Sequence, residues 1–184
     1  MQDASRVRVM DAASIDRSIT RMAHEILERH KGLSGIGLVG VQTRGVPLAR
    51  RLAAKLAAIE GAPPPVGVLD INLYRDDLSR IAEHPVLRRT EIPFAVDGAT
   101  VILVDDVLYT GRTVRAALDA LIDLGRPRAI ELAVLVDRGG RELPIQPDYV
   151  ALVERNVPIT HRVKVKLTER DGADEIVIDP RNAG

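Results

Sequence analysis

The chain contains no cysteine and no tryptophan, and its only aromatic residues are one phenylalanine and three tyrosines. Without cysteine there is no disulfide, no thiolate nucleophile and no metal site with cysteine ligands. So few aromatic rings also exclude a surface on which successive nucleic-acid bases stack against aromatic side chains. Chemistry and recognition must therefore come from carboxylates, basic side chains, hydroxyls and backbone groups.

Neither an excess of one charge nor a long apolar run is present. The 26 Lys and Arg residues balance the 26 Asp and Glu residues, so the formal net charge at pH 7 is +0. Such a chain has no overall field that draws it to nucleic acid or membrane, although a local patch can still do so. No 18 consecutive residues are apolar, and the charged amino-terminal stretch MQDASRVRVMDAAS is unlike a signal peptide. We expect a soluble, cytoplasmic protein with no membrane partner.

The remaining composition is that of a globular protein. Of the 184 residues, 46% are hydrophobic, which is enough for one continuous core and a single domain over residues 1–184. Residues 14–30 are predicted to form a helix, with Ser14 as its N-cap and Gly32 at its end. The apolar positions of this helix recur every three or four residues and are Ile15, Ile19, Met22 and Ile26.

Strands and helices then alternate along the chain. GLVGV at residues 37–41 is typical of a buried strand, and a short loop and a helix over residues 46–59 follow it. VILVDDV at residues 101–107 begins a second such unit, with a helix over residues 112–124 and a strand over residues 129–136. This alternation predicts an α/β fold in which a central, mainly parallel sheet is flanked by helices.

Two segments fall outside the alternation. Residues 66–95 are interpreted as a β-arm around a mobile loop, with one strand at 66–74 and a partner strand at 90–94. After residue 137 the pattern breaks, and two late strands are expected at 163–167 and 175–178.

Two adjacent acids, Asp105 and Asp106, stand at the end of an apolar strand, directly before a loop rich in hydroxyl groups. In open α/β sheets, ligands collect beyond the carboxyl ends of the strands. Gly111 lets the backbone approach an oxyanion, and Thr110 and Thr113 add donors at the start of a helix, so the loop can hold a phosphate. The acids then need sugar hydroxyls or a divalent cation, which points to a phosphorylated ribose. The alternative is that the acids only cap the following helix.

The stretch VILVDDVLYTGRT resembles the thirteen-residue signature with which type I phosphoribosyltransferases bind 5-phosphoribosyl-1-diphosphate (PRPP). The resemblance implies the fold of that family, with Asp105 and Asp106 at the ribose 2′- and 3′-hydroxyls and Mg²⁺ as cofactor. The two acids would meet the metal indirectly, together with PRPP. The residues it places around the 5′-phosphate are Tyr109, Thr110, Gly111, Arg112 and Thr113.

Two further loops resemble parts of the same family. Thr43, Arg44 and Gly45 resemble the diphosphate-binding loop, in which Arg44 would neutralise charge on the leaving group and act in catalysis with the two acids. LYRDDLS at residues 73–79 resembles the mobile flap that closes over PRPP, with its tip at Arg75, Asp76 and Asp77. The alternative for the flap is a solvated, charged hairpin tip.

A narrower resemblance covers residues 20–29, 69–79, 101–127 and 132–145. It is to the bifunctional members of the family, which make UMP from uracil and PRPP and also regulate pyrimidine genes by transcription attenuation. It implies a homodimer or higher homo-oligomer that binds UMP or UTP and a hairpin in the pyrimidine operon leader RNA. It also implies that Asp137 and Arg138 bind the base, within a small carboxy-terminal hood over residues 137–178.

One polar stripe is predicted on the first helix, opposite its apolar face, and carries Arg17, Thr20, Arg21 and His24. Such residues can contact phosphates and the unpaired bases of an RNA loop. The resemblance assigns this stripe, together with Arg29 and Arg141, to RNA binding. Without the resemblance, the ordinary interpretation is a solvated helix face.

Gly140 and Gln146 stand where related sequences carry histidine and arginine, and each change removes a polar contact from the regulatory half of the protein. Two alternatives therefore stay open. One is a catalytically weak RNA regulator that senses nucleotides, and the other is a salvage phosphoribosyltransferase without an RNA role.

Overall fold

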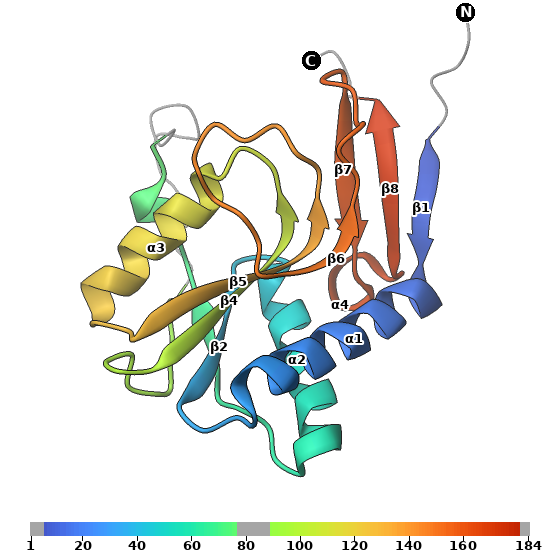
Figure 1. Cartoon of the computed structure of the whole chain (residues 1–184). Coiled ribbons are helices and arrows are strands. Elements are labelled where there is room, and N and C mark those ends of the chain that lie inside the picture. Colours follow the sequence, from blue (N-terminus) through green and yellow to red (C-terminus); the bar gives the residue numbers. More distant parts are fainter. Residues whose placement is uncertain (1–5, 77–88, 181–184) are drawn as a thin grey trace, which may run out of the picture.

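The computed structural model describes residues 6–76 and 89–180 and contains two sheets (Figure 1). The larger sheet has five strands, all parallel to their neighbours, in the order β3-β2-β4-β5-β6. Its strands are β2 (Ile36–Val41), β3 (Val66–Leu69), β4 (Thr100–Leu108), β5 (Ala129–Asp137) and β6 (Tyr149–Val153). The predicted parallel α/β sheet is confirmed.

Helices cover both faces of this sheet, because alternate residues of each buried strand point to opposite sides. On β4, Ile102 and Val104 pack with the helices α1 (Ala12–His30) and α2 (Gly45–Glu60), whereas Val101 and Leu103 pack with α3 (Arg112–Leu124). The apolar residues predicted for the first helix all lie in the core beside α2. Within residues 6–76 and 89–180, no helix combines the length and the hydropathy that a bilayer crossing needs.

The first helix starts earlier than the sequence pattern suggested. Its N-cap is Asp11, whose carboxylate accepts a hydrogen bond of 2.8 Å from the backbone N–H of Ser14, so the prediction of Ser14 as the cap was wrong. Asp11 is also the last residue of β1 (Val7–Asp11), a strand that the sequence analysis missed. At its other end the helix stops at His30, because Lys31 takes the left-handed conformation before Gly32 is reached.

Residues 66–95 differ from the expected β-arm. Val66–Leu69 pairs in parallel with β2 at the edge of the main sheet, and Asn72–Tyr74 forms a single 3-10 turn. The expected return strand is reduced to one isolated antiparallel bridge between Val68 and Glu91. The strand predicted over residues 66–74 is therefore present only as far as Leu69, and its alternating burial comes from its place in the main sheet rather than from a separate hairpin.

The smaller sheet is antiparallel, in the order β1-β8-β7, and stands beside the carboxyl edge of the main sheet (Figure 1). It confirms the late strands as β7 (His161–Lys166) and β8 (Glu175–Pro180), joined through the short helix α4 (Thr168–Asp171). The strands within the predicted hood, residues 137–178, are divided between the two sheets. Its β6 belongs to the main sheet, and the amino-terminal β1 supplies the third strand of the small sheet.

Candidate functional site

Three loops meet at the carboxyl edge of the main sheet, because β2, β4 and β5 are neighbours and run in the same direction. The loop at residues 43–45 follows β2, the acids lie near the end of β4, and Asp137 ends β5. The approach between the first two is close: a Cβ built on Gly45 would lie 2.3 Å from the carbonyl oxygen of Val104 and 3.3 Å from the Cα of Asp105.

The two acids differ in their surroundings. Asp105 is 7% exposed, and its Oδ1 accepts a hydrogen bond of 2.8 Å from the backbone N–H of Asp106. Burial, reinforced by the neighbouring charge of Asp106, raises the pKa of Asp105 well above its ordinary value. Asp106 is partly exposed and accepts from the N–H of Val107 at 2.8 Å. The N-cap of α3 is Gly111, and no side chain bonds there, so the alternative that the acids cap this helix was wrong.

The loop between β4 and α3 has the shape of an anion site. Gly111 takes a φ of 92°, a conformation that favours glycine, and the first turn of α3 follows it directly. Unpaired N–H groups at such a helix start attract oxyanions. Beside this turn lies a pocket of about 170 Å³, which is lined by Arg75, Asp76, Thr110, Arg112 and Thr113.

Arg112 joins this loop to the base of the predicted flap. Its Nη1 donates to Asp76 at 2.6 Å, and its Nε donates to Glu142 at 2.6 Å. Arg115 adds a longer ion pair of 3.8 Å to Asp76. The structure therefore brings Arg75, Asp76 and the phosphate-type loop together, while Asp77 lies outside the described residues.

The loop at residues 43–45 places Arg44 at the same edge. The Nη2 atom of Arg44 donates to Asp171 at 2.8 Å. Its Nε atom is buried and has no hydrogen-bond partner among residues 6–76 and 89–180. A buried donor left unpaired costs free energy, so an acceptor that reached this atom would offset that cost.

At the end of β5, Asp137 is 1% exposed and bound by protein donors. It accepts from the N–H of Gly139 at 2.9 Å and from Nη2 of Arg141 at 2.7 Å. Burial by itself would raise the pKa of Asp137, but the hydrogen bonds from Gly139 and Arg141 outweigh it and leave the pKa below its ordinary value. Arg138 is also buried, and its guanidinium lies 4.0 Å from the ring centre of Tyr109.

Gly140 packs against this stacked pair. Its φ is 75°, and a Cβ at this position would lie 2.4 Å from the ring of Tyr109. A larger residue at position 140 therefore requires Tyr109 to move. Glycine at position 140 therefore allows the ring of Tyr109 to lie this close to Arg138.

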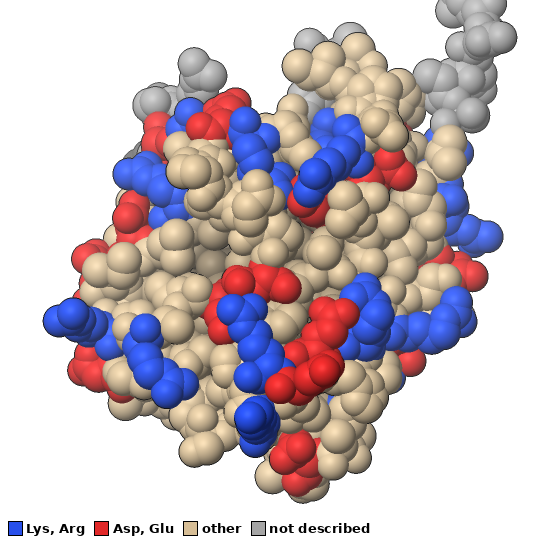
Figure 2. All heavy atoms as spheres, in the orientation of Figure 1, with Lys and Arg blue, Asp and Glu red and all other residues tan. Residues whose placement is uncertain are grey.

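The predicted polar stripe lies on the exposed face of α1, where Arg17, Arg21 and His24 are exposed and Thr20 is half-buried. Arg21 also has a structural function: it pairs with Glu25 and donates to the carbonyl oxygens of Val150 at 2.9 Å and Ala151 at 3.2 Å. The stripe is thus fixed to the edge strand β6. Around α1, acidic and basic side chains are interspersed rather than gathered by sign (Figure 2).

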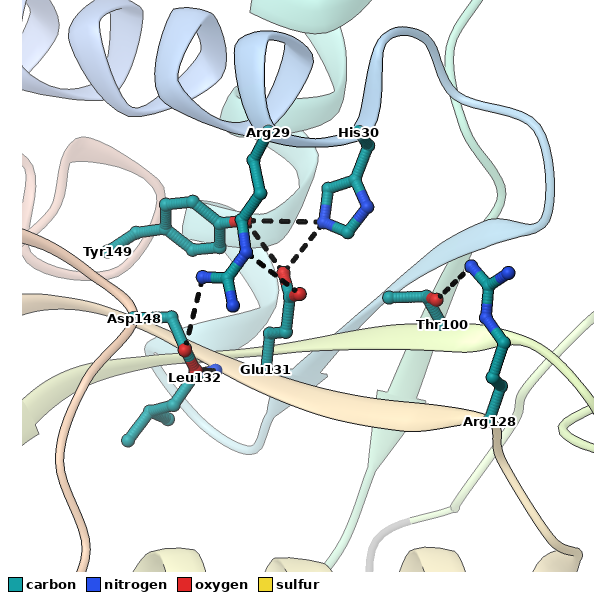
Figure 3. Close-up of polar contacts among 8 residues, drawn as sticks. All are labelled: Arg29, His30, Thr100, Arg128, Glu131, Leu132, Asp148 and Tyr149. Atoms are coloured by element: carbon teal, nitrogen blue, oxygen red, sulfur yellow. Dashed lines mark hydrogen bonds and ion pairs between the residues drawn. The ribbon is translucent and has the colours of Figure 1, made fainter.

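The other two arginines assigned to RNA lie apart from each other. Arg29 is at the end of α1, with ion pairs of 3.4 Å to Glu131 and 3.3 Å to Asp148 (Figure 3). Arg141 is at the opposite, carboxyl edge, where it also donates to the carbonyl oxygens of Ile145 at 2.8 Å and Tyr109 at 3.0 Å. Both guanidinium groups already have protein partners, and the structure does not bring Arg141 onto the helix stripe.

Beside Arg29 lies a polar cluster that the sequence analysis missed, formed by His30, Glu131 and Tyr149 (Figure 3). Glu131 accepts from the hydroxyl of Tyr149 at 2.6 Å and lies 2.9 Å from Nε2 of His30. Burial would raise the pKa of Glu131, but these bonds outweigh it and lower the pKa. The one available signal was an acid inside an otherwise apolar strand.

This cluster should stabilise the fold in a pH-dependent way. Because the folded pKa of Glu131 is lowered, its contribution is present above the ordinary value of 4.5 and is lost as the pH falls through the folded pKa. We expect Tyr149→Phe to lower the free energy of unfolding at pH 7 by about 1–2 kcal/mol, and the deficit should shrink at pH 4. Urea denaturation at both pH values measures this. Tyr74→Phe, which removes the exposed bond to Asp123, is the control and should change little. A deficit equal at both pH values would contradict the assignment.

Comparison with known proteins agrees with this geometry. The family model of the phosphoribosyl transferase domain matches residues 9–171. The chain is 58% identical over 175 residues to the bifunctional protein PyrR of Pelotomaculum thermopropionicum, covering 94% of this chain and 95% of that protein. It is 57% identical over 182 residues to PyrR of Deinococcus radiodurans, with 97% and 98% covered.

Solved structures give the same fold. A hypoxanthine phosphoribosyltransferase from Trypanosoma cruzi, in a ternary substrates complex, superposes with a TM-score of 0.74. Its sequence identity to this chain is 19%, and the alignment covers 99% of this chain and 98% of the other.

Proposed function

The chain belongs to the phosphoribosyltransferase family and, within it, to the PyrR proteins, and on this premise we propose that it has two activities. The first is transfer of the phosphoribosyl group from PRPP to uracil, which gives UMP and diphosphate. The second is UMP-responsive binding to the leader RNA of pyrimidine biosynthesis genes, with attenuation of their transcription. The supporting relatives match nearly their whole length and are named as bifunctional proteins.

One observation carries the transferase proposal: the loop at residues 43–45, the Asp105–Asp106 pair and the glycine turn before α3 converge at one sheet edge. We place the 5′-phosphate of PRPP at residues 109–113, on the start of α3. The ribose hydroxyls would then meet the carboxylates, and the diphosphate would face Arg44, whose buried Nε lacks a partner within the described part of the chain. As the C1–O bond to diphosphate breaks and the N-glycosidic bond to uracil forms, this guanidinium stabilises the charge on the leaving group.

Asp105 and Asp106 suit a Mg²⁺ ion that binds together with PRPP rather than to the protein alone. The described residues contain no group of three or more His, Cys, Asp or Glu side chains that could hold a metal alone. Mg²⁺ usually binds through one or two carboxylates together with substrate phosphates and water. Asp105 and Asp106 would hold it in that indirect way, and the bound ion would neutralise charge on the diphosphate.

The base is proposed to lie at the end of β5, beside Asp137 and Arg138. Asp137 is held ionised by Arg141 and the N–H of Gly139, and Arg138 is stacked on Tyr109 of the phosphate-type loop. This arrangement fixes the base relative to the ribose, and correct placement of the two reactants supplies much of the rate in such a reaction.

The transferase proposal is tested by incubating the protein with PRPP, Mg²⁺ and one base at a time. We expect UMP from uracil and no nucleotide from hypoxanthine, adenine or orotate. Product from one of these other bases would identify a different salvage enzyme. The absence of any product, with UMP still binding, would leave the nucleotide-sensing alternative.

RNA binding is proposed for the α1 stripe, with Arg29 and Arg141 as further candidates. Besides Gly140 and Gln146, the engagement of Arg21, Arg29 and Arg141 by protein partners favours the salvage enzyme without an RNA role. A filter-binding titration with the leader RNA of its own operon, with and without UMP and at several salt concentrations, decides between the two. Tight binding that UMP strengthens supports the regulator, and binding indifferent to UMP supports the salvage enzyme.

His24 is the cleanest probe of the RNA surface, because it is exposed on the stripe and, unlike Arg21, does not fix α1 to β6. We expect His24→Ala to weaken RNA binding about tenfold, which corresponds to ~1.4 kcal/mol, and to leave UMP formation unchanged. Lys55→Ala, on α2 and paired with Asp16, is the matched control and should keep both activities. Equal affinity of the His24 variant and the wild type would remove the stripe from the interface.

The proposed reactants and the operon transcript occur together in the cytoplasm, which is the location we propose. We also propose a homodimer or a higher homo-oligomer. Light scattering during gel filtration measures the assembly directly, and a monomer under all conditions would contradict this part of the proposal.

A further inference from the structure

The short helix α4, which connects β7 to β8 of the small sheet, brings an acid to the predicted diphosphate loop. Asp171, the last residue of α4, accepts a hydrogen bond of 2.8 Å from Nη2 of Arg44 through its Oδ1. Its Oδ2 accepts from the N–H of Leu167 at 2.9 Å. The bond from Leu167 and the charge of Arg44 overcome partial burial and lower the pKa of Asp171, so the carboxylate is anionic at neutral pH.

A second arginine fixes α4 itself. From α2, Arg51 donates to both carboxylate oxygens of Glu169 at 2.8 and 2.6 Å, and to both of Asp174 at 2.9 and 2.8 Å. Asp174 in turn accepts from the backbone N–H of Thr168 at 2.7 Å. Bidentate pairs of this kind restrict geometry as well as adding energy. The ion pairs of Arg51 therefore hold α4, and with it the Asp171 carboxylate that faces Arg44, in a fixed position.

Such a support matters for Arg44 because Asp171 binds only one of its nitrogens in the described residues. Its side chain is 32% exposed, and the Asp171 carboxylate holds one nitrogen, Nη2. The Nε atom is buried without a hydrogen-bond partner in the described residues, so the guanidinium keeps a donor free for another acceptor. An arginine side chain held at one end loses less rotational freedom when it binds an anion with the other.

We propose that Asp171 is a positioning residue that orients Arg44 toward the diphosphate of PRPP. This inference rests on the proposed transferase function and extends it, because it makes the small sheet part of the diphosphate site. It gives α4 a function in substrate binding besides connecting β7 to β8. Asp171 acts through Arg44 and does not touch the reacting atoms.

Asp171→Asn separates this role from a merely structural one. An asparagine has one acceptor oxygen and one NH₂ group, so it can still accept from Leu167 but then presents donors to Arg44. Glu175→Gln is the matched control, because it removes a carboxylate of the neighbouring small sheet, which pairs with Lys166 at 2.8 Å, and leaves both Arg44 and the Arg51 clamp on α4 intact. For both variants and the wild type, KM for PRPP, KM for uracil, kcat, product inhibition by diphosphate and the melting temperature are measured.

In Asp171→Asn, we expect KM for PRPP and the inhibition constant of diphosphate to rise about tenfold, while KM for uracil stays unchanged. Glu175→Gln should lower the melting temperature without this selective change. The double variant Arg44→Ala/Asp171→Asn should be no worse than Arg44→Ala alone, because both substitutions affect one interaction. Equal changes in Asp171→Asn and Glu175→Gln, or additive losses in the double variant, would overturn the proposal.

The test remains informative if uracil transfer fails. Calorimetric titration of the wild type and of Asp171→Asn with diphosphate and Mg²⁺ reports on Arg44 without any turnover. Weaker diphosphate binding by the variant supports the positioning role even when the wild type makes no UMP, which would refute only the base assignment. Equal affinities would refute the positioning role itself.

Discussion

Asp106→Asn is expected to lower kcat/KM for PRPP at least about 100-fold while the protein stays folded. The substitution removes the negative charge that would receive the ribose hydroxyls. The fold should tolerate it, since the oxygen of an asparagine can accept the hydrogen bond that the Asp106 carboxylate accepts from the N–H of Val107. Steady-state kinetics and thermal denaturation together measure the two effects.

The control for Asp106→Asn is Asp119→Asn, which removes a charge of the same sign from the surface of α3. Asp119 is 46% exposed in its side chain and pairs only loosely, at 3.3 Å, with Arg115. The Asp119→Asn substitution should leave both turnover and stability unchanged. A turnover of the Asp106 variant within about threefold of the wild type would exclude the proposed ribose contact.

Gly45→Ala is expected to abolish most PRPP turnover and to destabilise the fold by more than about 3 kcal/mol. The added Cβ would lie 2.3 Å from the carbonyl oxygen of Val104 and 3.3 Å from the Cα of Asp105, and both atoms belong to the backbone of a central strand. Neither can move without shifting the strand that carries the acids. The loop of Arg44 and the acids would therefore separate, which damages the site as well as the packing.

Gly61→Ala provides the comparison for this variant. Gly61 ends α2 with a φ of 87°, and nothing lies within 4 Å of a Cβ built there. Alanine at this position should cost about 1–2 kcal/mol for the left-handed conformation and leave kcat/KM of the folded protein unchanged. Urea denaturation gives the cost for each variant. A Gly45 variant as active as the Gly61 variant would show that the two loops do not depend on their close approach.

Local patterns determined the elements of this fold well. The helix over residues 112–124 and the strand that carries Asp105 and Asp106 were predicted because apolar periodicity follows directly from backbone geometry. The sequence motif also located the loop at residues 109–113, whose glycine turn and helix start are local features. The errors at the start of α1 and in residues 66–95 arose where a neighbouring strand, and not the local pattern, set the boundary.

By itself, the sequence determined the parallel α/β architecture and the position of a phosphate-type loop behind two acids. Only the tertiary structure decided which side chains act on those residues. Arg44 and Asp171 are 127 positions apart, and Glu131 and His30 are 101 positions apart, yet each pair is in contact. No spacing in a sequence encodes such contacts, because they depend on how β1, β7 and β8 assemble beside the main sheet and on where α1 ends. Periodicity fixes which face of an element is buried, whereas the partner across that face is chosen by packing.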